Sequence, residues 1–134
     1  MVRRMLLTLG CAWLAAPGCA HASRTVCLRI RNDSTEPFEH VWLGLPQRGS
    51  DADLGPLAPG QTSRWHALPA DPAAHYRKTR IQLARRQIIH VNDGAYPHAR
   101  NTLSPGRRYT FAYTLAGTQA RLDVIDEGTQ QPAR

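Results

Sequence analysis

Hydrophobic and polar residues alternate from Ser104 to Ile125 in the period that is typical of a β-strand with one buried face. The apolar side of this run carries Tyr109, Phe111, Tyr113 and Leu115. Ser104-Pro105-Gly106 precedes it as a turn signal, and Gly117-Thr118 allows a tight reversal before the alternation resumes. The pattern predicts a β-hairpin, which needs an opposing layer to bury its aromatic side chains.

The aromatic residues Tyr109, Phe111 and Tyr113 have two interpretations. They can form an exposed platform on which a carbohydrate stacks, or they can belong to the hydrophobic core. We favour the core because a sheet face this apolar needs cover. We therefore expect Phe111 to be buried together with Leu28, Ile30 and Leu122.

Shorter alternating runs predict further strands at 25–31, 38–45, 61–68, 75–83 and 87–92. In the hairpin formed by the last two, we expect Ile81 and Leu83 to share a face with Ile89 and Val91. A β-bulge near Lys78-Thr79 would keep this phase. The stretch 46–60 is dense in Pro, Gly and Asp and is predicted to be a loop.

About seven short strands without an amphipathic helix predict an all-β fold. We expect a single antiparallel β-sandwich of the immunoglobulin or transthyretin type over residues 23–127, followed by a flexible tail at 128–134. Asn32-Asp33-Ser34 fits the glycosylation pattern, but we interpret it as turn chemistry because the N-terminus is of bacterial type.

The N-terminus reads as an export signal. Arg3 and Arg4 precede an apolar segment that is too short to span a bilayer. Two cleavage routes are open. Ala20-His21-Ala22 is a site for ordinary signal peptidase, and cleavage there makes residues 1–22 the signal. Gly18-Cys19 instead resembles the end of a lipobox, which makes residues 1–18 the signal and Cys19 the acylated first residue.

The chain has three cysteines. Cys11 is lost with the signal, and Cys19 is either lost or acylated, so Cys27 is expected to be an unpaired strand residue. A reactive or dimer-forming thiol is the alternative. A disulfide between Cys19 and Cys27 would require cleavage before Cys19 without acylation.

Several fragments together resemble a family of small, functionally uncharacterised bacterial lipoproteins with one immunoglobulin- or transthyretin-like domain. The fragments are Ile30 to Ser34, Phe38 with Val41, Leu54 to Ser63, Tyr76 to Thr79 and Leu103 to Tyr113. The family's "D-Y-V-G-E"-like stretch is replaced here by Asn92 to His98. The resemblance favours a lipid anchor on Cys19 and supplies no catalytic residue. Ala20 follows Cys19 where an Asp would favour retention in the inner membrane, so the outer membrane is the expected destination.

The formal net charge is +7, and the cations cluster in one predicted hairpin. The cluster comprises Arg77, Lys78, Arg80, Arg85 and Arg86. On one face, these side chains would suit lipopolysaccharide or anionic headgroups; a solvated face is the alternative. Nucleic acid is not expected, because an exported protein rarely meets it and no aromatic side chains interleave the cluster.

Histidines offer a second functional class. The predicted domain holds His40, His66, His75, His90 and His98. Imidazoles from neighbouring strands can converge on Zn²⁺ or Cu²⁺, but no two of these residues show ligand spacing and no Cys-x-x-Cys accompanies them. We expect no metal and no cofactor, and we keep a soluble periplasmic metal-binding protein as the alternative.

An enzyme is the third class. Ser63, His66 and Asp71 supply the residue types of a catalytic triad, but a triad is recognised by its geometry and no G-x-S-x-G elbow is present. The sequence thus predicts a non-enzymatic binding or structural module of the cell envelope. We expect it on the periplasmic side of the outer membrane if Cys19 is lipidated, and otherwise free in the periplasm.

Overall fold

The computed structural model describes residues 25–44, 51–69, 77–92 and 103–129. Within these ranges the chain is all β and contains no helix, so no helix of the described part can cross a membrane. The strands are β1 (Thr25–Asn32), β2 (Phe38–Gly44), β3 (Ala52–Leu57), β4 (His66–Pro69), β5 (Arg77–Gln82), β6 (Gln87–Asn92), β7 (Arg107–Ala116) and β8 (Gln119–Thr129).

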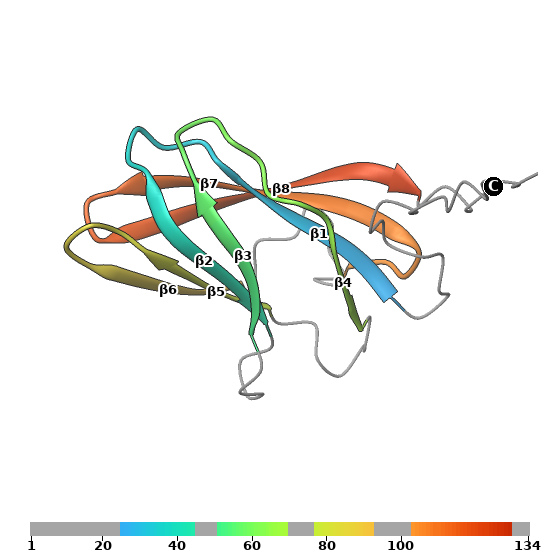
Figure 1. Ribbon diagram of the computed structural model, residues 1–134. Helices are drawn as coiled ribbons and strands as arrows, with labels where there is room; N and C mark the ends of the chain where they lie inside the picture. The colour runs from blue at the N-terminus through green and yellow to red at the C-terminus, as the bar shows by residue number, and fades with distance from the viewer. Residues whose placement is uncertain (1–24, 45–50, 70–76, 93–102, 130–134) are drawn as a thin grey trace, which may run out of the picture.

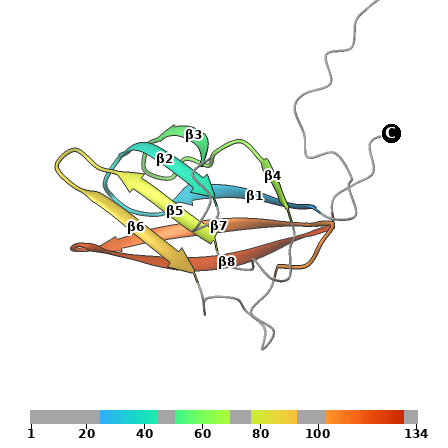
Figure 2. The ribbon, with the colours of Figure 1, turned by 90° about the horizontal axis from the view of Figure 1, so that it is seen from below.

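These strands form two four-stranded sheets that pack together as a β-sandwich (Figure 1). The first sheet has the order β4-β1-β7-β8, and the second has the order β3-β2-β5-β6. The β1–β7 pair is parallel, and the other strand pairs within the sheets are antiparallel. In Figure 2 the β5–β6 hairpin crosses over β7 and β8, and β6 lies against β8. The predicted sandwich is therefore confirmed at the level of two packed sheets.

The core lies between the sheets and is filled by inward-facing residues of every strand. Its fully buried members include Leu28, Ile30, Val41, Leu43, Ile81 and Phe111. Phe111 is completely buried, as expected, while Leu122 packs against the core at its margin. Tyr109 and Tyr113 are also buried, so the aromatic residues of β7 are core residues and form no exposed platform.

The hairpin of β7 and β8 confirms the sequence prediction and extends it. The strands pair over their whole length, but the register shifts where Arg108 faces Gly128 and Tyr109 faces Asp126. This β-bulge leaves Glu127 without a partner across the ladder. Gly128 adopts a positive φ of 96°, and its N–H donates to the carboxylate of Asp126. Strand β8 continues to Thr129.

The prediction missed strand β3. Leu54 and Leu57 bury their side chains three positions apart, and Gly55 between them has a φ of +74°. The β2–β3 register shifts near Val41, which faces Gly55. The local backbone irregularity breaks the two-residue period, so the sequence pattern indicated a loop.

The β5–β6 hairpin has a different phase from the predicted one. Arg77 to Gln82 pair with Gln87 to Asn92 without a register shift, so the expected bulge is absent. Ile81 faces Ile88 across the ladder, and both are buried. Ile89 and Val91 therefore lie on the opposite side from Ile81, in contrast to the prediction.

The turn after β1 is built around Asn32, whose side chain is completely buried. Its amide nitrogen donates to the carbonyls of Glu36 and Leu57, and its amide oxygen accepts from the backbone N–H and the hydroxyl of Ser34. All of these bonds hold the turn together. The interpretation of Asn32-Asp33-Ser34 as turn chemistry is confirmed.

Candidate functional site

The five cations of the predicted anion-binding cluster do not share one face. Lys78 and Arg80 lie on the outer side of the second sheet, and Arg85 is exposed in the turn between β5 and β6. Arg77 is only 2% exposed and donates to the carbonyl of Pro69 over 2.8 Å. Arg86 contacts Glu36 at 2.8 Å and the carbonyl of Gly117 at 2.9 Å. The expectation of a single basic face is therefore wrong for Arg77 and Arg86.

The outer side of the second sheet has two parts. We call the outer side of β5, β6 and their turn the β5–β6 face, and the outer side of β2 and β3 the β2–β3 margin. Each strand contributes a different kind of chemical group. Cross-strand neighbours define one row across all four strands, namely Asp53 of β3, Trp42 of β2, Arg80 of β5 and Ile89 of β6. In the next row, Lys78 of β5 faces Val91 of β6. Acidic, aromatic, cationic and apolar groups thus follow one another across the sheet.

Trp42 is the aromatic centre of this surface. The guanidinium carbon of Arg80 lies 4.1 Å from the centroid of its ring, and the ring of His40 stacks on it at 4.4 Å. His40 Nε2 donates to Asp53 Oδ1 over 2.5 Å. This bond, and then the N–H of Gly55, lower the pKa of Asp53. The indole is held between neighbours and fixes the position of Arg80.

Asp51 provides the counter-charge for the cations of β5. One of its carboxylate oxygens lies 3.3 Å from Lys78 Nζ and 4.0 Å from the guanidinium of Arg80. The carboxylate of Asp51 is packed so closely against Gly44 that a Cβ at position 44 would collide with the carboxylate. A single acid is thus shared by two cations, and Arg85 adds a further exposed charge at the end of the hairpin.

The apolar end of the row is exposed. Ile89 is 59% exposed and Val91 is 43% exposed, and they are the exposed large hydrophobic residues of the described ranges. The prediction that both share a face with Ile81 and Leu83 is wrong, because Ile88, Ile89 and Val91 present apolar side chains at both phases of the strand. The turn in which the N–H of Leu83 donates to the carbonyl of Arg86 decides the register. Recognising that turn in the sequence would have placed Ile89 and Val91 on the outer side of the sheet.

The inner side of the β5–β6 hairpin carries polar groups at one end of the core. The hydroxyl of Tyr113 donates to Thr79 Oγ1 over 2.7 Å and lies 3.3 Å from His90 Nδ1. Thr79 faces His90 across the ladder, and Arg77 is the next inward residue of β5. Thr79 and Tyr113 are completely buried. His90 therefore serves a polar network inside the sandwich and lies apart from His40.

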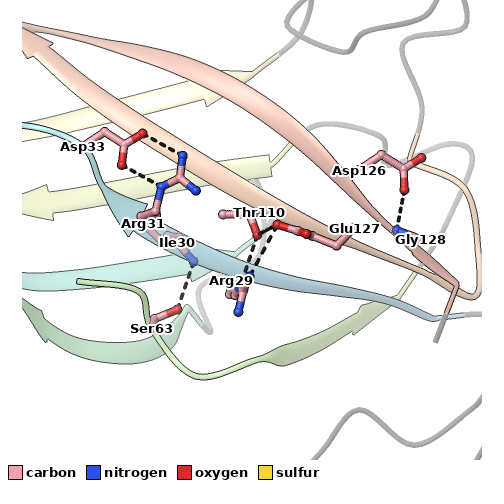
Figure 3. Close-up of polar contacts among 9 residues, drawn as sticks. All are labelled: Arg29, Ile30, Arg31, Asp33, Ser63, Thr110, Asp126, Glu127 and Gly128. Atoms are coloured by element: carbon pink, nitrogen blue, oxygen red, sulfur yellow. Dashed lines mark hydrogen bonds and ion pairs between the residues drawn. The ribbon is translucent and has the colours of Figure 1, made fainter. Parts of the chain in front are cut away.

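The outer side of the first sheet, which we call the arginine face, carries a hydrogen-bonded network (Figure 3). Thr110 Oγ1 accepts from Arg29 Nε over 2.9 Å and donates to Glu127 over 2.7 Å, and Arg29 also reaches Glu127 at 3.4 Å. The hydroxyl of Thr110, followed by Arg29, lowers the pKa of Glu127. The bulge in β8 supplies this carboxylate. The guanidinium carbons of Arg29 and Arg108 lie 4.2 Å and 5.4 Å from the ring centroid of Trp65.

A second pair on the arginine face joins Arg31 to Asp33. Arg31 donates to both carboxylate oxygens, at 2.6 Å and 2.9 Å (Figure 3). The pair raises the pKa of Arg31 and lowers that of Asp33. A pocket of about 310 Å³ lies beside it, lined by Asp33, Ala112, Thr114, Arg121, Leu122 and Asp123. The lining contains both signs of charge, and Asp33 is already engaged by Arg31, so the pocket has no clear preference for a charged ligand.

The alternative functions predicted from the sequence gain no geometric support from the residues that the structure describes. No group of three His, Cys, Asp or Glu residues in the described ranges can hold a metal ion; His75 and His98 lie outside these ranges. Burial, followed by the charge of Arg64, lowers the pKa of His66. The hydroxyl of Ser63 accepts from the N–H of Ile30 (Figure 3) and donates to the carbonyl of Arg64, and both are structural bonds. Asp71 lies outside the described residues.

Cys27 differs from the expectation. It lies on the outer side of β1, where it faces Ala67 of β4 and Arg108 of β7, yet it is completely buried. Its sulfur is part of a disulfide. The prediction of an unpaired thiol is therefore wrong. Cys11 and Cys19, including the predicted lipidation site, lie outside the described residues.

Comparison with known proteins does not assign the chain to a family. No protein-family model matches the sequence, and no curated protein matches it significantly. The resemblance to bacterial exported lipoproteins therefore stays a prediction.

Proposed function

We propose that the chain is an exported, non-enzymatic binding module of the cell envelope that docks on an anionic lipid surface. The docking surface is the β5–β6 face, which consists of Lys78, Arg80, Arg85, Ile89 and Val91. Export follows from the predicted signal at residues 1–22 or 1–18. The sandwich is proposed to be of the immunoglobulin or transthyretin type, which its size and its two mostly antiparallel sheets support.

One observation carries the proposal: exposed apolar side chains stand directly beside cations on the same hairpin. Ile89 faces Arg80 and Val91 faces Lys78 across the ladder. Apolar groups that enter the headgroup region, together with cations at the level of the phosphates, are the features by which a protein surface adsorbs to an anionic bilayer. The long stems of Lys78 and Arg80 allow the charged ends to reach the phosphates while the apolar side chains insert.

The remaining strands of the second sheet give this contact a direction. Asp51 and Asp53 lie on the β2–β3 margin, at the opposite side of Trp42 from Ile89. Anionic headgroups repel these carboxylates and attract the cations of β5. The bilayer should therefore contact β6 and the turn at Arg85 first, with β3 turned away from the surface.

Vesicle co-sedimentation tests this function. The purified exported protein should bind vesicles that contain phosphatidylglycerol and should bind pure phosphatidylcholine vesicles much more weakly. Binding should fall as salt rises, since the Debye length shrinks from about 10 Å at 0.1 M salt to about 3 Å at 1 M. Equal binding to both vesicle types, or no binding to either, contradicts the proposal.

Two single-arginine variants provide a matched comparison. Arg85→Gln removes an exposed cation from the docking surface, and Arg121→Gln removes an exposed cation from β8 on the other sheet. A cation near an anionic surface contributes about 1 kcal/mol, so Arg85→Gln should weaken vesicle binding about fivefold. Arg121→Gln changes the net charge equally and should leave it within about twofold. Equal losses from both variants would show that only net charge matters and would exclude a defined docking face.

The apolar contribution is tested with the double variant Ile89→Ser/Val91→Ser. Both side chains are exposed, so the variant should fold with nearly unchanged stability. It should retain salt-sensitive attraction to phosphatidylglycerol vesicles but lose the part of binding that survives at high salt. Unchanged binding at high salt would show that Ile89 and Val91 do not enter the bilayer.

A further inference from the structure

Strand β8 is an edge strand of the first sheet. Its sheet has the order β4-β1-β7-β8, so within the described ranges β8 pairs with a strand on one side only. Two other edge strands carry features by which proteins avoid edge-to-edge pairing, since β3 contains Pro56 and the four-residue β4 ends at Pro69. In β8 the bulge at Glu127 interrupts only the last part of the strand. The segment 119–125 therefore forms a regular edge.

The register of the β7–β8 hairpin shows which backbone groups of β8 point away from β7, in the plane of the sheet. The two-residue turn pairs Ala116 with Gln119 as the closing hydrogen-bonded pair. Hydrogen-bonded and non-hydrogen-bonded pairs then alternate along an antiparallel ladder, so the bonds to β7 come from the odd-numbered residues of 119–125. The N–H and C=O groups that point away belong to Ala120, Leu122 and Val124. In the part of the chain that the structure describes, these groups have no backbone partner.

We propose that this edge pairs with the same edge of a second copy of the chain, antiparallel and with Leu122 facing the partner's Leu122 on a two-fold axis. In this register Ala120 faces the partner's Val124 on both sides of the axis, and the three pairs form about six hydrogen bonds. The four-stranded first sheets of both copies then become one continuous sheet. This inference does not rest on the proposed docking on lipid, which uses the strands of the other sheet.

The charged residues of β8 select this register. Arg121 and Asp123 are exposed on the same side of the strand, and neither forms an ion pair with another described residue. With Leu122 on the axis, Arg121 faces the partner's Asp123 twice, in non-hydrogen-bonded pairs where facing side chains are closest. A slip by two residues would place either two arginines or two aspartates opposite each other, which is destabilising. A slip by four residues would bring Arg121 to Glu127, which is already engaged on the arginine face.

The inner side of the same edge offers apolar surface for burial. Ala120 and Leu122 are half-buried and pack against the margin of the core. In the pairing, Leu122 lies beside the partner's Leu122 and Ala120 beside the partner's Val124, so the exposed parts of these side chains leave water. On the outer side, the pocket that Arg121 and Asp123 line leaves room for the partner's charged side chains. Backbone groups, charges and apolar surface therefore all fit a second copy.

Analytical ultracentrifugation of the purified exported protein, without lipid, tests the proposal. The wild type should show a reversible monomer–dimer equilibrium between about 1 µM and 1 mM, because a strand edge is a small interface. Asp123→Arg places like charges opposite each other twice and should raise the dissociation constant at least about tenfold. Glu39→Arg makes the same charge change at an exposed residue of β2. It is the matched control and should leave the dissociation constant within about twofold.

The double variant Arg121→Asp/Asp123→Arg exchanges the two charges and restores opposite charges across the axis. It should therefore dimerise nearly as well as the wild type. Both residues are exposed, so the Tm of the monomer should stay within about 2 °C of the wild-type value. A wild type that remains monomeric at 1 mM, a double variant that does not recover, or an equal loss in Glu39→Arg overturns the proposal.

Ala120→Pro tests the backbone pairing. The N–H of Ala120 points away from β7, so proline keeps the hairpin ladder, as edge strands tolerate, but removes a donor from the dimer. A folded Ala120→Pro variant that dimerises like the wild type contradicts the proposed pairing. At concentrations where only monomers sediment, the vesicle comparison of Arg85→Gln with Arg121→Gln is independent of this pairing. Failure of the dimer and failure of lipid docking are therefore measured separately.

Discussion

The two outer faces of the sandwich both carry arginines, but they use them differently. On the arginine face, Arg29 and Arg31 each have an acidic partner, and Thr110 beneath them is completely buried. On the β5–β6 face, Lys78 and Arg80 share Asp51, and the strand beside them exposes Ile89 and Val91. Clustered charge therefore does not identify a binding surface by itself. The informative feature is apolar surface left open beside cations that are only partly neutralised.

The largest predicted effect removes the core that both faces share. Phe111→Ala deletes a completely buried ring between the sheets and should cost about 3–5 kcal/mol of the free energy of unfolding, through lost burial and a residual cavity. Because small domains have only about 5–15 kcal/mol in total, the variant should be unfolded or marginal. Chemical denaturation followed by tryptophan fluorescence measures this loss.

Phe111→Leu is the control, since it keeps most of the buried volume and should cost clearly less. Both faces should lose their contacts together in Phe111→Ala, because each depends on the same core. A Phe111→Ala variant with unchanged Tm would mean that the ring is not packed as described.

An intermediate effect is expected from Thr110→Val, which acts on the arginine face alone. Valine keeps the shape of threonine but removes the hydroxyl that joins Arg29 to Glu127. Bonds to charged groups contribute more than neutral ones, but these partners are partly exposed, so the loss should be about 1–2 kcal/mol. Because the hydroxyl is the largest cause of the lowered pKa of Glu127, that pKa should rise in an NMR titration.

Thr114→Val on the same strand is the matched control, because Thr114 is exposed. It should change stability by less than about 0.5 kcal/mol and leave the pKa of Glu127 unaltered. Vesicle binding should be unaffected in both threonine variants. If Thr110→Val loses vesicle binding at a temperature where the variant is folded, the docking surface lies on the arginine face.

The smallest predicted effect is a pH dependence at the edge of the first sheet. Burial lowers the pKa of His66 below its ordinary value of 6.5, so the unfolded chain binds protons at a higher pH than the folded one. The contribution to stability is therefore full above about pH 6.5 and is lost as pH falls through the folded-state pKa. His66→Gln should reduce the loss of Tm between about pH 7.5 and 5.5. The acids with a lowered pKa titrate below their ordinary values of 3.8 for aspartate and 4.5 for glutamate, outside this window. An unchanged pH profile would show that His66 does not titrate in this range.

The sequence predicted the fold well where the two-residue period is uninterrupted. Strands β1, β2 and β7 were predicted nearly at their observed bounds, because their inward positions are apolar and clear turn residues separate them, whereas β8 runs past the predicted end at Ile125 to Thr129. Strand β3 was missed because Gly55 and Pro56 lie inside it, and glycine and proline normally indicate a loop. Its pairing with β2 includes register shifts that no local pattern encodes.

The candidate site was predicted in part. Lys78, Arg80 and Arg85 were identified from their charge, but Arg77 points into the core because its neighbours Thr79 and Ile81 face inward with it. Ile89 and Val91 were assigned to the wrong face, because Ile88 and Ile89 are equally apolar. A shift of one residue in the pairing turns every side chain of a strand to the opposite face of the sheet. The disulfide of Cys27 was missed because the prediction counted Cys27 as the one cysteine with a free thiol after export.

The parallel pairing of β1 with β7 has a consequence for when the chain can fold. Arg29 and Thr110, which meet on this pair, are 81 positions apart, and β1 completes its place in the first sheet only when residues 107–116 are available. Contacts of such long range make folding slow, because a large loop must close before they form. While the chain emerges from the ribosome, β1 lacks its neighbour β7. The first sheet therefore cannot be completed before residues 107–116 have been synthesised.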